Sequence, residues 1–473
     1  MIGALSSRDI ERFRAAVVLR TGLWFDDQKF DYLASVLERR LQALREAPSV
    51  YLSRLETQAN VQAELRELAQ DLTVGETYFF RHTDQFRACS EVALAHRVEA
   101  RAASRQLRLL SAGCSSGEEA YTLAILTRER GLDARWDVRI NAVDMNPMAL
   151  ERAKQGRYSS WALRETPEQI KKQYFTEDGR DYVLAKAIRD SVVFEEGNLV
   201  ADDSWLPESY DVIFCRNVLM YFTPDNAERV VARFARALAP GGYLFLGHAE
   251  NLRGLSQAFE LLHTHGTFYY QRRDASHALA MVPRAVEMPV QAPRSALALD
   301  WASTWLETVQ RSSDRIRALT ERPIAERPPA LEAPGRAPLA RLDLSLALEL
   351  LSHERFAEAL DVLTQMPASS ANDPDAVLLR AALLTHCGRF EAAELACAEL
   401  LVQDSLSAGA HYLRSLCRER QADTRAAIEH AQIACYLDPA FAMPHLHLGL
   451  IARRMGDRSA AQRELTQAAL LLQ

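Results

Sequence analysis

The sequence predicts two kinds of structure in one chain: an α/β domain built around a parallel sheet, and an all-α array of repeated helix pairs. Strand-like segments alternate with helix-like segments from about residue 107 to 270, the pattern of a parallel sheet covered by helices on both faces. After residue 340, similar residues recur every 34 positions, which indicates a repeat architecture. The length of 473 residues agrees with two to four domains.

Composition and charge exclude several classes of protein. Hydrophobic residues make up 48% of the chain, and 56 basic against 63 acidic residues leave a net charge of -7. This balance argues against nucleic acid as a partner and against an anionic membrane surface. No apolar run approaches the roughly 18 residues of a membrane span, and charged residues interrupt the first segment before a signal core could form. We therefore expect a cytoplasmic protein without direct membrane insertion.

The seven cysteines predict reduced thiols. Their number is odd, they are widely scattered, and no two of them form a CxxC pair. These features do not fit a disulfide framework or a zinc site.

Residues 1–72 are predicted to form a helical subdomain, because apolar residues recur at helical spacing in 13–23, 30–44 and 61–72. Turn-like residues, including the Ala47-Pro48 pair, separate these segments. Three arginines lie close along the second predicted helix, namely Arg39, Arg40 and Arg45. A solvated helix face is the favoured interpretation of these arginines, and a docking face for an acidic protein is the alternative.

Residues 276–340 are predicted to form a linker. Eight of the eighteen prolines fall between Pro283 and Pro338, where regular apolar periodicity is weak. Within the linker, residues 297–319 could form one amphipathic helix. Packing of this helix against a neighbouring domain is favoured over binding to a partner.

Residues 341–473 contain four copies of a 34-residue unit. Small and apolar residues recur in one register, as the spacing of Ala359, Ala393, Ala427 and Ala461 shows. Small residues at fixed positions let two antiparallel helices approach closely, and stacked pairs bury faces that one pair could not. This segment resembles the tetratricopeptide repeat family, whose concave groove commonly holds a peptide or a partner protein.

A ligand crevice is predicted where the first strand of the α/β domain ends. The strand runs directly into a turn with Gly113 and Gly117, which would let a ligand approach the main chain closely. The glycine spacing does not match the dinucleotide fingerprint, and Glu118 and Glu119 at the start of the next helix would repel a phosphate. A ligand carrying positive charge is favoured instead, and S-adenosylmethionine carries both a sulfonium and an ammonium group.

Asp144 ends the second predicted strand, about thirty residues after Gly113. An ionised carboxylate there could accept hydrogen bonds from both hydroxyl groups of a ribose. The alternative is that Asp144 caps the helix that follows. In combination with the Gly113 turn, the ligand interpretation is favoured.

Polar residues also close two further strands of the predicted sheet. Asn198 follows one short strand, and Arg216 and Asn217 follow the next. Polar side chains at the ends of apolar strands commonly face a site. We expect Asn198 to orient the adenine or its neighbouring loop, and Arg216 and Asn217 to lie where the methyl donor and acceptor meet.

Several motifs, taken together, resemble the chemotaxis receptor glutamate methyltransferases over residues 5–272. They are TVGETYFFR, SAGCSSGEEAYT, NAVDMNP, GNLV, FCRNVLMYF and GGYLFLGHAEN, and they occur in the order seen in that family. The resemblance implies a Rossmann-like methyltransferase domain at 73–275 that uses S-adenosylmethionine and releases S-adenosylhomocysteine. It also implies that the acceptors are glutamate side chains on the cytoplasmic domains of methyl-accepting chemoreceptors.

The resemblance also assigns roles to single residues. Arg97 and Tyr221 would orient the substrate carboxylate or line the methyl-transfer site, against the simpler interpretations of a solvated helix arginine and a half-buried tyrosine. His248 and Glu250 of the GHAEN motif are expected to be structural, and no metal is expected. The residues implied to contact the donor, with Gly113 added from the turn itself, are Thr77, Arg81, Gly113, Glu118, Asp144, Asn198, Leu199, Arg216 and Asn217.

Residues 157–195 occupy the place where the family inserts a small antiparallel β subdomain. The loop TEDGRDY in this insertion is short, which favours an enzyme that does not tether to a receptor's terminal peptide. We expect the repeats to provide a different tether, by binding a signalling protein or a receptor segment.

Two other functions stay open at this point. A methyltransferase of the same fold could act on a small molecule or on nucleic acid, although the absence of a basic stripe counts against nucleic acid. A scaffold that only senses S-adenosylmethionine is the third possibility, and the intact set of site residues counts against it.

Overall fold

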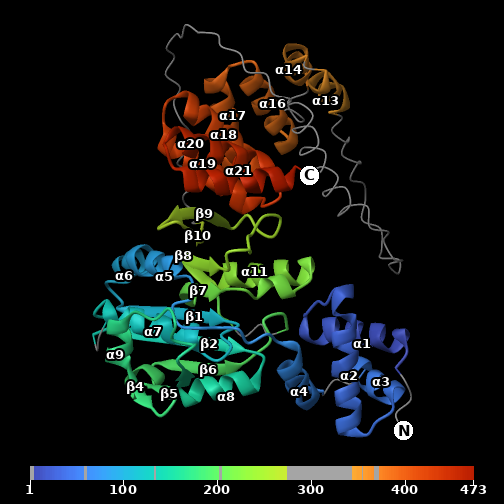
Figure 1. Cartoon of the computed structure of the whole chain (residues 1–473), viewed down its shortest axis with the longest axis vertical. Helices are drawn as coiled ribbons and strands as arrows, with labels where there is room; N and C mark the ends of the chain where they lie inside the picture. The colour runs from blue at the N-terminus through green and yellow to red at the C-terminus, as the bar shows by residue number, and fades with distance from the viewer. Residues whose placement is uncertain are drawn as a thin grey trace. The chain divides into compact units, whose positions relative to one another are not determined.

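The computed structural model describes residues 5–57, 61–132, 135–201, 205–273, 344–353, 355–366 and 372–472 (Figure 1). The chain divides into two compact units, Met1–Met281 and Val282–Gln473. The predicted linker at 276–340, with its possible helix at 297–319, lies outside the described residues.

Four helices form the amino-terminal part of the first unit: α1 (Ser7–Thr21), α2 (Phe30–Leu44), α3 (Pro48–Thr57) and α4 (Gln62–Leu72). The prediction of a helical region is confirmed, but α3 replaces part of the turn expected around Pro48. Proline is well suited to the first position of a helix, because its missing N–H would have no helical partner there and its φ angle is already helical.

The arginines of α2 brace it against α4. Arg40 Nε and Nη2 donate to the two carboxylate oxygens of Glu64, each at 2.8 Å. Arg39 pairs with Asp71 at 2.9 Å. Arg40 is therefore neither a solvated residue nor free to dock an acidic partner, because its charge is used inside the subdomain.

A seven-stranded sheet forms the centre of the first unit, in the order β6-β2-β1-β7-β8-β10-β9. The five strands from β6 to β8 are parallel, and β10 and β9 form an antiparallel hairpin at one edge. β1 pairs with β2 on one side and β7 on the other, so the strand order reverses at β1. The strands are β1 (Gln106–Ala112), β2 (Asp137–Asp144), β6 (Val192–Glu196), β7 (Tyr210–Cys215), β8 (Leu238–Leu246), β9 (Phe259–Thr264) and β10 (Thr267–Arg272).

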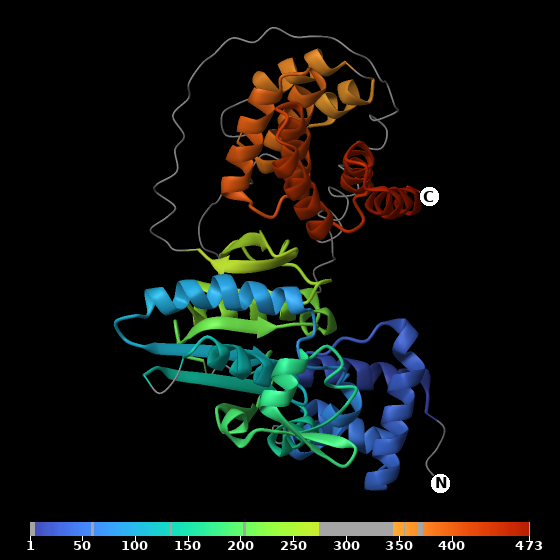
Figure 2. The ribbon, with the colours of Figure 1, turned by 60° about the vertical axis from the view of Figure 1, so that its left-hand side comes forward.

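Helices cover this sheet. α7 (Glu118–Glu129) contacts β1, β2 and β6, α8 (Pro147–Gln155) contacts β2 and β6, and α11 (Pro224–Ala237) contacts β8. A continuous helical run from α5 (Thr83–Ala88) through η2 (Cys89–Leu94) to α6 (Ala95–Ala100) lies along the sheet, as Figure 2 shows. The two shorter elements of this unit are η1 (Asp27–Lys29) and η3 (Leu219–Tyr221).

The predicted β insertion is a three-stranded antiparallel sheet in the order β3-β5-β4. Its elements are β3 (Arg157–Ser159), α9 (Glu168–Tyr174), β4 (Phe175–Asp178), β5 (Asp181–Leu184) and α10 (Lys186–Arg189). The next strand, β6, begins at Val192 and belongs to the main sheet, so the insertion ends earlier than the predicted residue 195.

The second unit consists of helix pairs with the predicted 34-residue spacing. The small residues of the repeat are buried between helices; a Cβ on Gly449, for example, would lie 2.7 Å from Cγ of Leu465. Among the described residues, no helix is both long and apolar enough to span a bilayer. The pairs are α13 (Ser345–Ser352) with α14 (Phe356–Thr364), α16 (Pro374–His386) with α17 (Phe390–Gln403), α18 (Ala408–Arg420) with α19 (Thr424–Leu437), and α20 (Ala442–Arg454) with α21 (Arg458–Leu471).

Candidate functional site

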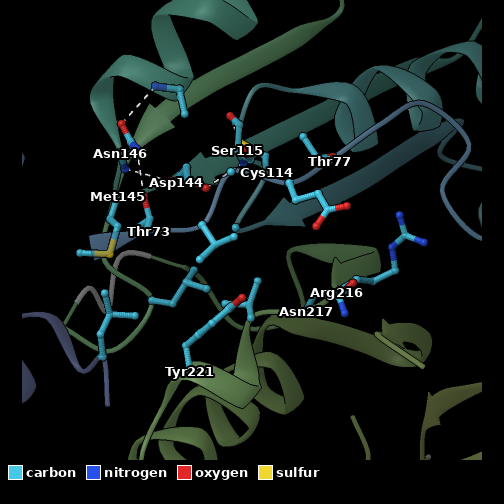
Figure 3. Close-up of a pocket in the computed structure, with 18 of the residues that line it drawn as sticks. Thr73, Thr77, Cys114, Ser115, Asp144, Met145, Asn146, Arg216, Asn217 and Tyr221 are labelled. Carbon is cyan, nitrogen blue, oxygen red and sulfur yellow. Dashed lines mark hydrogen bonds between the residues drawn. The ribbon is translucent and has the colours of Figure 1, made fainter. Parts of the chain in front are cut away.

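A pocket of about 270 Å³ lies where the carboxyl ends of β1, β2, β6 and β7 meet (Figure 3). The turns after these strands form one wall, and residues 72–77 with Arg81 form another. This position, beside the reversal of strand order at β1, is where open α/β sheets bind ligands. Of the predicted site residues, the pocket is lined by Thr77, Arg81, Gly113, Asp144, Asn198, Leu199, Arg216, Asn217 and Tyr221.

Asp144 closes β2 and places its carboxylate at the pocket wall. Its Oδ2 accepts a hydrogen bond from the Ser115 N–H, and its Oδ1 accepts one from the Asn146 N–H, each at 2.8 Å. Burial raises the pKa of Asp144, and these backbone hydrogen bonds oppose that rise. Each carboxylate oxygen retains acceptor capacity. Asp144 can therefore accept hydrogen bonds from two neighbouring hydroxyl groups of a ligand.

The residue that caps the helix after β2 is Asn146, not Asp144. Asn146 Oδ1 accepts from the N–H groups of Met148 at 3.0 Å and Ala149 at 3.1 Å, at the start of α8. Its Nδ2 donates to the Thr73 hydroxyl at 2.9 Å, which joins this turn to the segment after α4. The alternative role considered for Asp144, a helix cap, is thus filled by its neighbour.

Arg216 follows β7 and is held by acceptors from three segments. Its Nε lies 2.6 Å from Glu119 Oε2, and its Nη1 donates to Gln85 Oε1 at 3.1 Å and to the Arg81 carbonyl at 2.5 Å. The Ser111 hydroxyl donates to the other oxygen of Glu119 at 2.7 Å. The charge of Arg216 is therefore compensated inside the protein, and the guanidinium group is fixed at the pocket.

Asn217 offers a buried acceptor to a ligand. Its backbone has a φ of 60°, which turns the chain sharply after β7. Its Oδ1 is buried and makes no hydrogen bond within the described part of the chain. A buried polar atom without a partner is costly, and a ligand that donates a hydrogen bond or carries an ammonium group would satisfy it.

The site fits S-adenosylmethionine in the groups that it presents. Asp144 supplies acceptors for two hydroxyl groups, and Asn217 Oδ1 supplies one for an ammonium group. The carboxylate of Glu119 adds negative charge to the wall, balanced by Arg216. Gly113 packs its Cα against Val218, where a Cβ would come within 2.5 Å, so only glycine fits this turn.

Glu118 lies beside the pocket and is not among the residues that line it. Its carboxylate accepts a hydrogen bond from the Ser116 hydroxyl at 2.8 Å. Burial raises the pKa of Glu118 to about 7. Its neighbour Glu119 takes the place at the pocket wall that the sequence assigned to Glu118.

Asn198 and Leu199 tie the pocket to the amino-terminal helices and to α11. Asn198 Nδ2 donates to the Arg20 carbonyl at 3.2 Å, and its Oδ1 accepts from the Val200 N–H at 2.9 Å. The Leu199 carbonyl accepts a hydrogen bond from Arg233. Both residues line the pocket, but the side chain of Asn198 is already engaged in holding its own loop.

Tyr221 lies in η3, and its hydroxyl points into the pocket (Figure 3). Its carbonyl accepts a hydrogen bond from the Trp24 N–H at 2.7 Å. The neighbouring Phe222 forms an isolated antiparallel bridge with Leu23. The loop after α1 therefore supports the segment that carries Tyr221.

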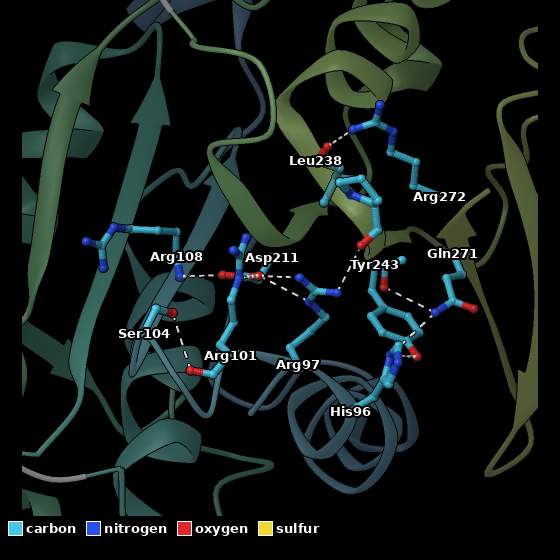
Figure 4. Close-up of polar contacts among 12 residues, drawn as sticks. His96, Arg97, Arg101, Ser104, Arg108, Asp211, Leu238, Tyr243, Gln271 and Arg272 are labelled. Atoms are coloured by element: carbon cyan, nitrogen blue, oxygen red, sulfur yellow. Dashed lines mark hydrogen bonds and ion pairs between the residues drawn. The ribbon is translucent and has the colours of Figure 1, made fainter. Parts of the chain in front are cut away.

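Arg97 is not among the residues that line the pocket, and its polar contacts lie at the amino end of β7 (Figure 4). Its Nη2 lies 2.8 Å from Asp211 Oδ1, and its Nη1 donates to the Pro240 carbonyl at 3.0 Å. Asp211 stands at the start of β7, whereas Arg216 follows the end of the same strand. The prediction that Arg97 orients the substrate is corrected: its guanidinium joins α6 to the amino end of β7, whereas the pocket lies at the carboxyl end.

Several residues that the sequence alone does not single out reach the pocket through the fold. Leu23 reaches it from the amino-terminal helices, and Ser115 and Asn146 reach it from the turns after β1 and β2. The missed carboxylate is Glu119, whose role depends on Arg216 lying next to it. Only the pairing of β1 with β7 places these two residues together, and no local sequence pattern states that pairing.

Comparisons with known proteins agree with this geometry. The family described as CheR methyltransferase, SAM binding domain, matches residues 75–268. Chemotaxis protein methyltransferase 2 of Vibrio cholerae is 35% identical over 264 residues, which cover 54% of this chain and 90% of that protein. The probable biofilm formation methyltransferase WspC of Pseudomonas putida is 29% identical over 422 residues, covering 89% of this chain and 88% of that protein.

An uncharacterized 104.1 kDa protein of Rhodobacter capsulatus is 34% identical over 237 residues, and this chain spans 25% of its length. The sheet order, the pocket at its carboxyl edge and the acceptors of that pocket define the class of an S-adenosylmethionine-dependent methyltransferase. Within that class, the chain belongs to the CheR methyltransferase family.

Proposed function

We propose that this protein transfers the methyl group of S-adenosylmethionine to glutamate side chains on the cytoplasmic domains of methyl-accepting chemoreceptors. The observation that carries the proposal is the pocket at the reversal of strand order, with Asp144 and Asn217 presenting acceptors to a cationic nucleoside ligand. Relatives named as chemotaxis protein methyltransferases support a place in chemotaxis-like signalling, and glutamate as the acceptor follows from the motif resemblance.

The bound donor supplies an electrophilic methyl group on a positively charged sulfur. A glutamate carboxylate, with an ordinary pKa of about 4.3, is already ionised at neutral pH and needs no general base. As its oxygen bonds to the methyl carbon, the carbon–sulfur bond breaks and its electron pair stays on sulfur, giving a methyl ester and S-adenosylhomocysteine. The protein must therefore position the two groups and exclude water.

Different residues of the pocket are proposed to bind the donor and to place the acceptor. Asp144 holds the ribose hydroxyl groups, and Asn217 with Glu119 holds the ammonium end of the donor. Tyr221 lines the place where the acceptor carboxylate meets the methyl group. The remaining residues proposed to contact the donor are Thr77, Arg81, Gly113, Asn198, Leu199 and Arg216.

The repeats are proposed to bind a partner that brings the enzyme to its receptor. The relatives that this chain matches over most of its length are named as probable biofilm formation methyltransferases. We therefore propose a chemotaxis-like signalling system that controls surface attachment. The partner held by the repeats is a signalling protein or a segment of the receptor.

The test is transfer of labelled methyl groups to soluble cytoplasmic fragments of chemoreceptors. The full chain is incubated with the labelled donor, and the label released as methanol by alkali is measured. Base-labile label on the receptor is expected, because methyl esters hydrolyse in alkali whereas N-methyl groups do not. Alkali-stable label, or no transfer by a protein that binds the donor, would contradict the proposal and favour another substrate or a donor-sensing scaffold.

A further inference from the structure

Glu250 turns its carboxylate onto the backbone of the loop that follows β7. Its Oε2 accepts the N–H groups of Asn217 and Gly247, each at 2.7 Å. Its Oε1 accepts the N–H groups of Val218 at 2.8 Å and Met220 at 3.2 Å. One side chain thus satisfies four backbone donors, and three of them belong to residues 217–220.

This arrangement carries a cost in free energy. Glu250 is only 5% exposed, and burial raises its pKa, although the four backbone hydrogen bonds oppose that rise. Asn217 has a φ of 60°, in the left-handed region that asparagine adopts more readily than most residues other than glycine. A buried carboxylate that accepts three backbone N–H groups from residues 217–220 indicates that this loop is held in place by Glu250.

Gly247, in the same GHAEN motif, leaves space for this contact. A Cβ at Gly247 would lie 2.7 Å from Glu250 Oε2 and 2.9 Å from the backbone N of Asn217. The second of these atoms belongs to the main chain, which cannot move aside without moving the loop. Gly247 and Glu250 therefore act together on the position of Asn217.

The loop held in this way carries groups of the pocket, whereas Glu250 itself does not line it. We propose that Glu250 is a positioning residue for methyl transfer, which fixes the backbone of residues 217–220 so that Asn217 and Tyr221 face the pocket. The role of Glu250 in methyl transfer rests on the proposed function. Its effect on donor binding is independent of that function, because donor binding can be measured without a receptor.

Glu250→Gln tests the proposal directly. It removes the charge and replaces one acceptor oxygen by an NH₂ group that cannot accept. We expect S-adenosylhomocysteine, titrated into the full chain by calorimetry, to bind at least about tenfold more weakly, which corresponds to about 1.4 kcal/mol. We also expect kcat to fall while the KM for the receptor fragment stays unchanged, because the loop holds the donor side of the site.

Asp211→Asn is the matched control. Asp211 is a buried carboxylate at the other end of β7, where it accepts from Arg97, Arg101 and the Arg108 N–H (Figure 4). A purely structural role lowers the melting temperature and leaves the donor affinity of the folded protein unchanged, as expected for Asp211→Asn. The same behaviour in Glu250→Gln would overturn the proposal.

Gly247→Ala disturbs the same contact sterically and keeps the carboxylate. It should also weaken S-adenosylhomocysteine binding, and it decides the question if Glu250→Gln does not fold; unchanged affinity in Gly247→Ala would then overturn the proposal. A wild-type chain that binds S-adenosylhomocysteine but methylates no receptor would contradict only the proposed substrate. A wild-type chain that does not bind it would overturn both.

Discussion

Glu119 and Arg216, which are 97 residues apart in the sequence, form a buried ion pair at the centre of the site, with Glu119 Oε2 2.6 Å from Arg216 Nε. Their side chains are 9% and 3% exposed. The pair joins the first turn of α7 to the loop after β7, across the point where the strand order reverses. The ion pair fixes both side chains at the pocket wall.

Glu119→Gln should be strongly destabilising. The substitution leaves the buried guanidinium of Arg216 without its carboxylate, and breaking a buried pair in this way costs about 3–5 kcal/mol. Urea denaturation should show a lower free energy of unfolding, and donor affinity should fall because Arg216 keeps only its neutral acceptors, Gln85 and the Arg81 carbonyl. A variant as stable as the wild type would show that the charge of Glu119 is not needed to compensate Arg216.

Glu118→Gln should stabilise the protein at pH 8. Burial raises the pKa of Glu118 from 4.5 to about 7, so the folded protein loses stability as the pH rises from about 4.5 to 7 and Glu118 ionises. A neutral side chain escapes this penalty, which is up to about 3 kcal/mol. Urea denaturation should show Glu118→Gln more stable than the wild type at pH 8 and equal to it at pH 4. Equal stability at both pH values would exclude a raised pKa.

Arg97→Met should separate a structural from a catalytic role. Loss of this guanidinium removes one partner of the buried Asp211 and should lower the melting temperature. The folded variant should bind S-adenosylmethionine as the wild type does, since Arg97 does not line the pocket. Weaker donor binding or loss of transfer in a fully folded variant would show that Arg97 takes part in donor binding or methyl transfer.

Removal of residues 341–473 should leave methyl transfer measurable on a soluble receptor fragment. Every residue that lines the pocket lies between Leu23 and Phe222, within the first compact unit. Transfer by the truncated chain is measured as alkali-released methanol, after circular dichroism has established that it is folded. Complete loss of transfer in a folded truncation would show that the repeats take part in the reaction.

Much of the fold could be predicted from sequence because it depends on local periodicity. The strands ending at Ala112 and Asp144 have buried apolar residues in their second halves and run into turns, and the repeats show a fixed spacing of small residues. Helix α3 was missed because Pro48 is typical both of a turn and of the first position of a helix. The end of the β insertion was misplaced because β6 has the same local pattern whether it pairs with β2 or with a hairpin.

The site was predictable where a residue closes a strand and not where its role depends on a distant partner. Asp144 ends β2 and Asn217 follows the end of β7, so the sequence predicts both at the pocket. The choice between Glu118 and Glu119 depends on which of them faces Arg216, and the place of Arg97 depends on Asp211. Such pairings are set by the order of strands in the sheet, which a single sequence does not state.

The measurement that tests the account most directly is calorimetric titration of S-adenosylmethionine into the full chain and into two aspartate variants of β2. Asp137 begins this strand and Asp144 ends it, so Asp137→Ala is a control on the same element. We expect the wild type and Asp137→Ala to bind the donor, and binding to be weakened by about 1.5–3 kcal/mol in Asp144→Ala, as expected when a charged hydrogen-bond acceptor is lost. Equal affinity in all three proteins would contradict the placement of the donor at the carboxyl edge of the sheet.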